Sequence, residues 1–367
     1  MENLDEIVSK YDYAFDPTLI ANEPASPRDS AKLLAYDRKT GTPLFDTFAN
    51  IGNYLPKGAV LVLNDTKVFP ARLHCTKKTG GRVEIFYLGS DGRTPPQSSL
   101  LKRGGGTIRA LTNHFLDIGE KVFLNDTIFF EVMGKEDKIY TLRPSFPIGD
   151  VQKVFKKYGE TPIPPYIKNT KLSETQLREK YQTVFAKNTG SVAAPTASLH
   201  FTKRLLAKLK KQGIQIEFVT LHVNLGTFAP LTEEALKTGK LHKEWYEIPE
   251  KTAKALMKAK KEGRPIIAVG TTAVRTLEEW VNSPRGRSSG SLPRTALGGN
   301  GETRLFIRPG YKFRFVDGMI TNFHVPKSSL LMLVSAFVGR EKLLELYQEA
   351  MRKNFRFFSF GDGMLLL

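Results

Sequence analysis

The pattern of apolar residues changes at Pro144, and this change constrains the fold more than any other feature of the sequence. Across residues 59–145, short apolar runs alternate with turn residues and show no helical period. One run, at 83–88, directly follows the Gly80-Gly81 pair, which is typical of a hairpin turn. A series of short strands joined by turns predicts a small antiparallel β-barrel.

Beyond Pro144, stretches with helical spacing alternate with short apolar runs typical of buried strands. Helical spacing begins with Val151, Val154 and Phe155. The further predicted elements are a helix from Ser198 to Gly213, a strand at 214–221, a helix ending at Gly263, a strand at 265–269, a helix at 271–281, strands near 305–307 and 313–316, and helices from Ser328 and Glu341. This alternation predicts an α/β domain with partly parallel strands.

The chain has 367 residues, which is long for one compact core and suits two domains. We therefore expect an α/β main domain, discontinuous in sequence and carrying the catalytic site, from residues 1–66 and 148–367. A small antiparallel β-barrel domain is expected as an insertion at 67–147.

The excess of basic residues restricts the choice of partner. Lys and Arg total 55 against 37 for Asp and Glu, so the formal net charge is +18. Such an excess attracts polyanions, and we favour a nucleic-acid partner over a merely solvated basic surface. A membrane surface is a weaker candidate, because no long basic amphipathic helix stands out.

Cysteine content and hydropathy predict a cytoplasmic protein. The single cysteine, Cys75, can form neither a disulfide framework nor a cysteine zinc site. The first residues do not resemble a secretory signal, and the longest apolar run, at 330–338, is too short to cross a bilayer.

Common nucleotide-binding and catalytic motifs are absent. The sequence has no GxGxxG, no Walker loop and no HExxH. Residues 286–290 match the GxSxG nucleophile elbow, but no strand precedes them and no helix follows. They lie in a stretch at 282–303, rich in Ser, Gly, Arg and Pro, which we interpret as a mobile basic loop.

Two segments combine small or polar residues at the predicted ends of strands. In residues 191–198, small side chains allow a ligand to approach the backbone, and Ser198 can cap a helix whose N–H groups suit an anion; an ordinary capped connector is the alternative. In residues 220–228, His222 lies near a strand end and can act as a general base, although a lone histidine is more often structural. The binding candidates in these segments are Ala193, Pro195, Thr196, Gly226, Thr227 and Phe228.

Three further segments suggest a binding site. Residues 269–276 read as strand, glycine turn and helix start, where hydroxyls and free amides can bind a carboxylate or phosphate; a plain threonine cap is equally compatible. Residues 317–327 crowd polar groups at a strand-to-helix junction, or simply fix a bend at Pro326. Residues 62–72 lie where the two parts of the chain meet, as a pocket edge or as a hinge. The candidates here are Thr271, Thr272, Arg275, Asp317, Asn322, His324, Asn64, Asp65, Thr66 and Arg72.

Taken as a set, these motifs resemble the S-adenosylmethionine:tRNA ribosyltransferase-isomerase family of queuosine synthesis. The resemblance covers nearly the whole chain in the same order. The matching runs are LVLNDTKVFPARL at 61–73, PIPPYI at 162–167, YQTVFAKNTGSVAAPTASLHFT at 181–202, FVTLHVNLGTFAP at 218–230, IIAVGTTAVRTLE at 266–278, DGMITNFHVPKSSLLMLVSAF at 317–337 and RFFSFGDGM at 356–364, with a similar stretch from Tyr11 to Leu34. The sequence departs from the family pattern at Asn224, where glycine is usual, and at Gly363, where alanine is usual.

The resemblance implies an α/β domain with an inserted β-barrel and a specific reaction. S-adenosylmethionine, as co-substrate, transfers its ribosyl unit to 7-aminomethyl-7-deazaguanine at the wobble position of a tRNA. Adenine and methionine leave, and epoxyqueuosine forms. The implied partner is the anticodon arm of that tRNA. We expect the chain to act as a monomer and to need no prosthetic group.

The chemistry of this reaction suggests roles for the candidate residues. The sulfonium acidifies the adjacent ribose methylene, so His222 or His324 can serve as the base. Asp317 or Asn322 can assist the departure of adenine, and Thr271 and Thr272, with Arg275 nearby, can hold the methionine carboxylate. No metal is required. The alternatives are an S-adenosylmethionine-dependent RNA methyltransferase and a non-catalytic tRNA-binding module.

Overall fold

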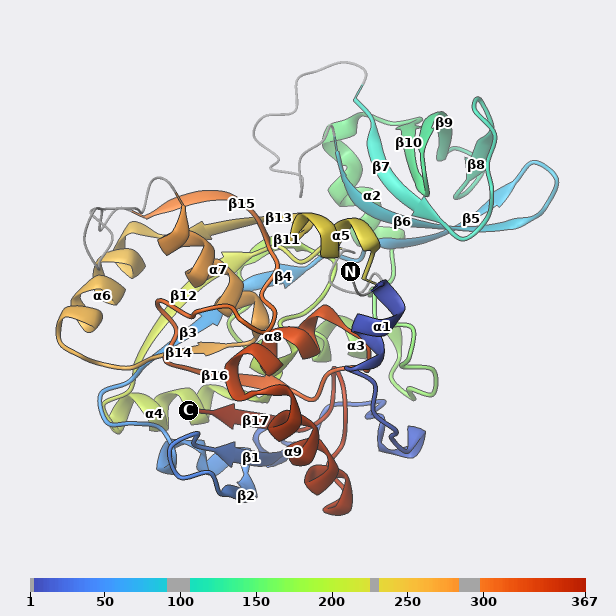
Figure 1. Cartoon of the computed structure of the whole chain (residues 1–367). Coiled ribbons are helices and arrows are strands. Elements are labelled where there is room, and N and C mark those ends of the chain that lie inside the picture. Colours follow the sequence, from blue (N-terminus) through green and yellow to red (C-terminus); the bar gives the residue numbers. More distant parts are fainter. Residues whose placement is uncertain (1–2, 91–105, 225–230, 284–297) are drawn as a thin grey trace.

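A large mixed β-sheet forms the centre of the molecule, and a small closed barrel lies at one end (Figure 1). The computed structural model describes residues 3–90, 106–224, 231–283 and 298–367. Within these residues the main sheet has nine strands in the order β15-β13-β12-β3-β14-β16-β17-β1-β2. They are β1 (Lys32–Tyr36), β2 (Pro43–Thr47), β3 (Val60–Asn64), β12 (Gln215–Leu221), β13 (Lys240–Ile248), β14 (Ile266–Val269), β15 (Gly299–Leu305), β16 (Gly318–Asn322) and β17 (Gly363–Leu366).

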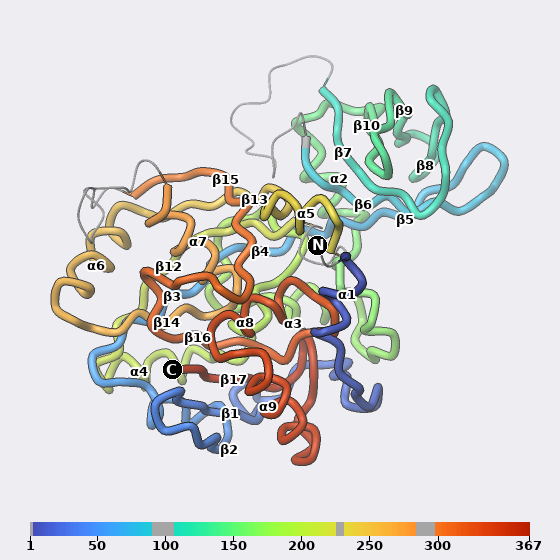
Figure 2. Tube along the Cα trace, viewed as in Figure 1, coloured from blue at the N-terminus to red at the C-terminus, as the bar shows by residue number. Residues whose placement is uncertain are grey.

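The centre of the sheet is parallel, because β12, β3, β14 and β16 all run in one direction. The C-terminal strand β17 inserts antiparallel beside β16 and parallel to β1. The C-terminus therefore lies within the sheet (Figure 2). Parallel strands place their carboxyl ends at one edge of the sheet, where α/β proteins usually bind ligands.

Both faces of the sheet are covered by helices, which explains the continuous apolar character of the central strands. Alternate residues of β3 point to opposite faces: Val60 and Val62 belong to the same apolar cluster as residues of α6, α7, α8 and α9, and Leu61 and Leu63 to the same cluster as residues of η3 and α4. The helices are α1 (Leu4–Ser9), α2 (Val151–Tyr158), α3 (Glu174–Lys180), α4 (Lys203–Lys211), α5 (Glu233–Thr238), α6 (Glu250–Lys261), α7 (Thr271–Asn282), α8 (Ser329–Val338) and α9 (Arg340–Arg352), with the 3-10 turns η1 (Pro17–Leu19), η2 (Arg28–Ser30), η3 (Phe48–Asn53), η4 (Ile148–Asp150) and η5 (Thr196–His200).

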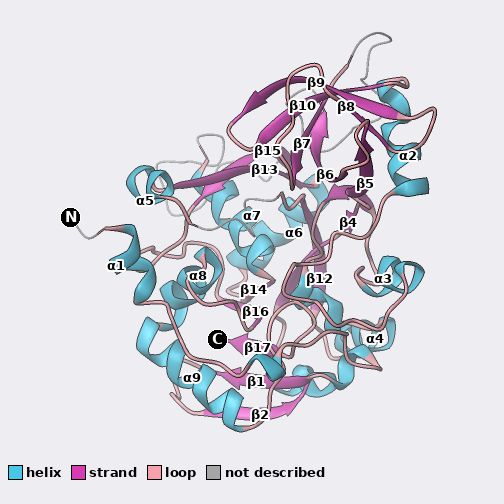
Figure 3. Ribbon diagram, turned by 90° about the vertical axis from the view of Figure 1, so that its right-hand side faces the viewer, coloured by secondary structure: helices cyan, strands magenta, loops and turns pink. Residues whose placement is uncertain are grey.

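Six antiparallel strands close the barrel in the order β10-β7-β6-β5-β8-β9. They are β5 (Arg72–Lys77), β6 (Arg82–Ser90), β7 (Ile108–Thr112), β8 (Lys121–Phe123), β9 (Phe129–Glu136) and β10 (Ile139–Pro144). Figure 3 shows the barrel at the opposite end of the molecule from β1 and β2. The predicted fold class, an α/β domain with a small antiparallel barrel, is confirmed.

The apolar core of the barrel extends beyond its strands. Phe155 of α2 packs on Phe69 and Tyr87, with ring centroids 5.4 and 5.1 Å apart. Val192 belongs to the same apolar cluster. A short parallel pair, β4 (Thr66–Val68) and β11 (Asn188–Ser191), links this region to the main sheet. The proposed domain boundaries at 66/67 and 147/148 remain a prediction.

One helix start and one strand were predicted wrongly, each for an identifiable reason. The helix predicted from Ser198 begins at Lys203, because the Thr202 side chain caps it by accepting the N–H of Leu205. Ser198 instead lies in η5, with its hydroxyl buried. Residues 313–316 form no strand, because the backbone N–H groups of Arg314, Phe315 and Val316 donate to the buried carboxylate of Glu278 rather than to a neighbouring strand.

The predicted loop at 282–303 is partly a strand. Residues 299–305 form β15, which pairs antiparallel with β13, and residues 284–297 lie outside the described part of the chain. Within the described ranges, no helix combines the length and the apolar character needed to span a membrane.

A candidate active-site pocket at the carboxyl ends of the parallel strands

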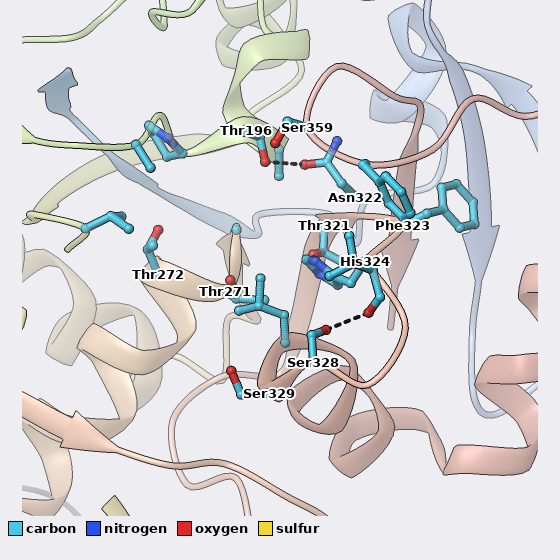
Figure 4. Close-up of a pocket in the computed structure, with 18 of the residues that line it drawn as sticks. Thr196, Thr271, Thr272, Thr321, Asn322, Phe323, His324, Ser328, Ser329 and Ser359 are labelled. Atoms are coloured by element: carbon cyan, nitrogen blue, oxygen red, sulfur yellow. Dashed lines mark hydrogen bonds between the residues drawn. The ribbon is translucent and has the colours of Figure 1, made fainter. Parts of the chain in front are cut away.

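A cavity of about 330 Å³ opens where β14 and β16 end and α7 and α8 begin (Figure 4). Volumes of this order accommodate small organic ligands. The described residues that line it come from six separate parts of the sequence: Pro165, Tyr166, Ala193, Ala194, Pro195, Thr196, Ala197, Val223, Gly270, Thr271, Thr272, Thr321, Asn322, Phe323, His324, Val325, Pro326, Lys327, Ser328, Ser329, Leu330, Phe358 and Ser359.

Two helix N-termini border the cavity. Helix α7 begins at Thr271 directly after β14, and Gly270 makes the connection with φ +88°, a conformation that favours glycine. Helix α8 begins at Ser329, and Ser328 caps it by accepting the N–H of Leu331. Free N–H groups and the helix dipoles make this part of the cavity suited to a carboxylate or phosphate.

The described lining of the cavity contains few charged side chains. None of its described lining residues is acidic, and Lys327 is the one cation among them. The Lys327 ammonium lies 2.9 Å from the Asp12 carboxylate, so it is already paired. The helix N-termini therefore dominate the local potential, and they favour an anion.

His324 lies at the cavity with its backbone and ring both held. Its Nε2 lies 2.8 Å from the Thr321 hydroxyl. The backbone N–H of His324 donates to the Tyr347 hydroxyl at 2.8 Å, and its backbone carbonyl accepts from the Tyr13 hydroxyl. Burial lowers the pKa of His324 to about 4, so the ring is neutral at pH 7.

Asn322 is positioned beside His324 by a chain of hydrogen bonds. Its Oδ1 accepts from the Thr196 hydroxyl at 2.8 Å, and its Nδ2 lies 3.4 Å from Nε2 of His200. Burial lowers the pKa of His200 to about 3, which keeps its ring neutral and able to accept a hydrogen bond. Figure 4 shows Thr196 and Asn322 directed toward each other at the edge of the cavity.

His222 lies behind the cavity lining. The next residue, Val223, lines the cavity, but the His222 ring stacks on Trp245 with centroids 5.0 Å apart, and its Nδ1 lies 2.7 Å from the Thr66 hydroxyl. Burial lowers the pKa of His222 to about 4. These contacts are those of a packed structural histidine.

Asn64 and Asp65 belong to a network that joins β3 to β12. Asn64 accepts from the Leu221 N–H and donates to the Thr272 hydroxyl. The Asp65 carboxylate accepts from the hydroxyl of Thr220 at 2.6 Å, and burial raises its pKa. Asn64 thereby supports the start of α7 from behind and does not itself line the cavity.

Three further predicted site residues, Asp317, Arg72 and Arg275, lie away from the cavity. Asp317 precedes β16 and Asn322 ends it, so the strand separates them by roughly 16 Å. The Asp317 carboxylate instead accepts a hydrogen bond from the Lys260 ammonium at 2.7 Å, at the opposite end of β16. The predicted role of Asp317 in adenine departure does not fit this position. Arg72 lies on the barrel beside Glu84, and the Arg275 guanidinium is buried against the Glu244 carboxylate.

Some of the predicted binding residues lie together around the cavity. Others lie outside the described part of the chain. Those that line the cavity with His324 are Ala193, Pro195, Thr196, Thr271, Thr272 and Asn322. Gly226, Thr227 and Phe228 lie among the residues that the structure does not describe.

Several lining residues were not predicted, notably Tyr166, Phe358 and Ser359. Phe358 has φ +69° and Lys327 has φ +57°, and such conformations in non-glycine residues are concentrated at functional sites. The available signals were the prolines of the PIPPYI run and the aromatic residues of the RFFSFGDGM run, but no local periodicity placed either run beside β16.

Both departures from the family pattern have a structural setting. Asn224, which follows the cavity-lining Val223, donates its side-chain amide to the Lys243 carbonyl at 3.2 Å. A Cβ at Gly363 would lie 3.0 Å from the Phe48 ring and 3.4 Å from the His200 ring. Gly363 thus leaves room for the pair of rings behind Asn322.

Comparison with known proteins gives consistent matches over the whole chain. A family model described as queuosine biosynthesis protein matches residues 8–366. A protein of Thermotoga maritima named S-adenosylmethionine:tRNA ribosyltransferase-isomerase is 42% identical over 361 residues, covering 98% of this chain and 99% of its own. One of Gloeobacter violaceus with the same name is 42% identical over 368 residues, covering 100% and 97%. The crystal structure of an S-adenosylmethionine tRNA ribosyltransferase from Thermotoga maritima aligns with a TM-score of 0.54 and 32% identity, over 98% of this chain and 100% of that chain.

Proposed function

The chain belongs to the queuosine biosynthesis family of S-adenosylmethionine:tRNA ribosyltransferase-isomerases, and we propose that it performs this reaction on 7-aminomethyl-7-deazaguanine at the wobble position of a tRNA. It transfers and isomerises the ribosyl moiety of S-adenosylmethionine. The products are epoxyqueuosine in the tRNA, free adenine and free methionine.

The observation that carries the proposal is that His324 and the N-termini of α7 and α8 line the same cavity. S-adenosylmethionine combines an anionic carboxylate with a sulfonium that acidifies the neighbouring ribose carbon. The starts of α7 and α8, with the hydroxyls of Thr271 and Thr272, suit the carboxylate. The neutral ring of His324 suits the removal of the acidified proton.

The first step is the removal of a proton from the ribose methylene by a ring nitrogen of His324. The electron pair left on the carbon drives rearrangement of the ribose and expulsion of adenine. The Asn322 amide, held by Thr196 and His200, is positioned to hydrogen-bond the departing base. The proton taken up by His324 passes to the departing adenine. The neutral amine of the deazaguanine then forms a C–N bond and loses a proton. A ribose oxygen closes the epoxide by displacing the sulfur, so methionine leaves as a neutral thioether.

The tRNA partner accounts for the charge of the chain. A net charge of +18 attracts the phosphate backbone without reading sequence. We propose that the anticodon arm is held by this basic surface while its modified base enters the cavity. We propose that the chain acts as a monomer.

The test is incubation of the chain with S-adenosylmethionine and a tRNA that carries 7-aminomethyl-7-deazaguanine, followed by nucleoside and small-molecule analysis. Epoxyqueuosine with one equivalent each of adenine and methionine is the expected result. Formation of S-adenosylhomocysteine and a methylated nucleoside would instead identify an RNA methyltransferase. Salt-sensitive tRNA binding without turnover would identify a binding module.

A further inference from the structure

The cavity presents an electrostatic problem for its proposed ligand. A sulfonium carries a full positive charge, but the described lining residues include no carboxylate, and the starts of α7 and α8 repel a cation. The Asp12 carboxylate, which lies beside the lining residue Lys327, is paired with its ammonium. Some other feature of the cavity must therefore stabilise positive charge.

Two aromatic rings in the lining have the required property. The rings of Tyr166 and Phe358 lie 5.0 Å apart with an angle of 59° between their planes, so they form a corner. The electron-rich faces of aromatic rings attract cations, and pairs of rings recognise quaternary ammonium groups in this way. A sulfonium has the same charge and a similar shape.

The corner is rigid. The Tyr166 hydroxyl lies 2.6 Å from the Ser359 hydroxyl, which fixes the orientation of the tyrosine ring. The Phe15 ring supports Phe358 from behind, with centroids 5.1 Å apart and planes at 70°. A ring that is already fixed loses little conformational entropy when a ligand binds to it.

The backbone at Phe358 supports a functional role for its ring. Its φ of +69° is costly for an aromatic residue and would suit glycine. Two hydrogen bonds hold this conformation, from the Phe358 N–H to the Phe323 carbonyl at 3.1 Å and from the Gly361 N–H to the Phe358 carbonyl at 3.0 Å. Because Phe323 directly precedes His324, the corner also lies beside the proposed base.

We infer that Tyr166 and Phe358 bind the sulfonium of S-adenosylmethionine through their ring faces, while the N-termini of α7 and α8 bind its carboxylate. This inference rests on the proposed function. It assigns charge selectivity for the ligand to aromatic rings instead of an acidic side chain, and it places the sulfonium next to His324.

The test compares two ligands that differ in this charge. S-adenosylhomocysteine is the neutral thioether of the same molecule, so calorimetric titration of both ligands isolates recognition of the sulfonium. The wild-type chain should bind S-adenosylmethionine more tightly. Phe358→Leu and Tyr166→Leu should each weaken S-adenosylmethionine binding by about tenfold and change S-adenosylhomocysteine binding by less than about twofold. Phe358→Trp, which keeps an aromatic face, should retain the preference.

Phe45→Leu is the matched control, because Phe45 packs on Phe355 at the far edge of the sheet and should leave both affinities unchanged. Equal losses for both ligands in the Tyr166 and Phe358 variants would mean that the rings stack on adenine, and this would overturn the inference. A wild-type chain that binds both ligands equally would overturn it while leaving the proposed function intact. A wild-type chain that binds neither would overturn both.

Discussion

The Tyr13 hydroxyl donates a hydrogen bond to the His324 carbonyl at 2.5 Å, although 311 residues separate the two in sequence. The Tyr13 ring also packs edge-on against Tyr347, whose hydroxyl accepts the His324 N–H. Burial raises the pKa of Tyr13 well above 10, so its hydroxyl remains a donor at physiological pH. A segment near the N-terminus thus holds the backbone of the proposed base from one side, and α9 holds it from the other.

Tyr13→Phe removes this hydrogen bond and preserves the ring packing. Loss of one such bond costs about 1 kcal/mol of stability, but a displaced base costs more in rate, so we expect kcat to fall about tenfold or more. The KM for S-adenosylmethionine should change less than about threefold. Steady-state kinetics with precursor tRNA measures both values. The control is Tyr311→Phe, which removes a hydrogen bond to Glu278 outside the cavity and should leave kcat unchanged. Equal kcat losses in the two variants would contradict a positioning role for Tyr13.

The two candidate histidines should differ in their effect on turnover. His324→Gln should lower kcat by about 100-fold or more, because it removes the proposed base, which lines the cavity. His222→Gln should mainly lower stability, because the ring packs on Trp245 and Thr66. Turnover assays and urea unfolding of both variants provide the comparison. Wild-type turnover in both variants would remove histidine base catalysis from the mechanism.

Asp317→Asn tests the separation of the two ends of β16. The substitution weakens the ion pair with Lys260 at the end of β16 that is remote from the cavity. The Asp317 side chain is 44% exposed. We expect kcat and KM to stay within about twofold of wild type, since exposed ion pairs contribute little. A kcat loss comparable to that of His324→Gln would return Asp317 to the catalytic site.

The buried histidines make stability depend on pH. Burial lowers the pKa values of His200 to about 3 and of His222 and His324 to about 4, whereas an unfolded histidine titrates near 6.5. Between these values the unfolded state binds more protons, so the free energy of unfolding falls as pH decreases from 6.5 toward 4. Each histidine should contribute about 2 kcal/mol to this loss at pH 5.

Urea unfolding at pH 7.5 and pH 5.0 measures this loss. His200→Gln should show a smaller difference between the two pH values than the wild-type chain, because the variant has one fewer group that gains a proton on unfolding. An identical difference in both chains would show that His200 does not titrate as its burial implies.

The Arg275–Glu244 ion pair should act on stability and not on ligand affinity. Both side chains are buried, and Arg275 also donates to the Leu305 carbonyl at 3.1 Å. Arg275→Met leaves the Glu244 carboxylate buried without its cation and should cost about 3–5 kcal/mol. Adding Glu244→Gln should recover part of that loss, and the KM for S-adenosylmethionine should remain unchanged in the double variant. A selective rise in KM would instead support contact between Arg275 and the methionine carboxylate.

The elements defined by local periodicity could be predicted from the sequence. The strands that build the barrel and the alternation around Ile266–Val269 and Thr271–Asn282 depend on spacing within one element. The same reasoning located Thr271, Thr272 and Asn322, because each lies where a buried strand ends. The start of α4 was misplaced, since Ser198 and Thr202 are both able to cap a helix and only packing selects between them.

The sequence by itself determined the two architectures, the family and the strand ends that border the cavity, because these depend on apolar spacing and on ordered motifs. Only the tertiary structure decided which polar residues share a cavity. Asp317 and Asn322 are five positions apart yet lie at opposite ends of β16. Tyr13, Phe358 and His324, in contrast, come from distant segments and lie close together. The length of a strand separates near neighbours, and the order of strands brings remote residues together; neither effect leaves a local pattern in the sequence.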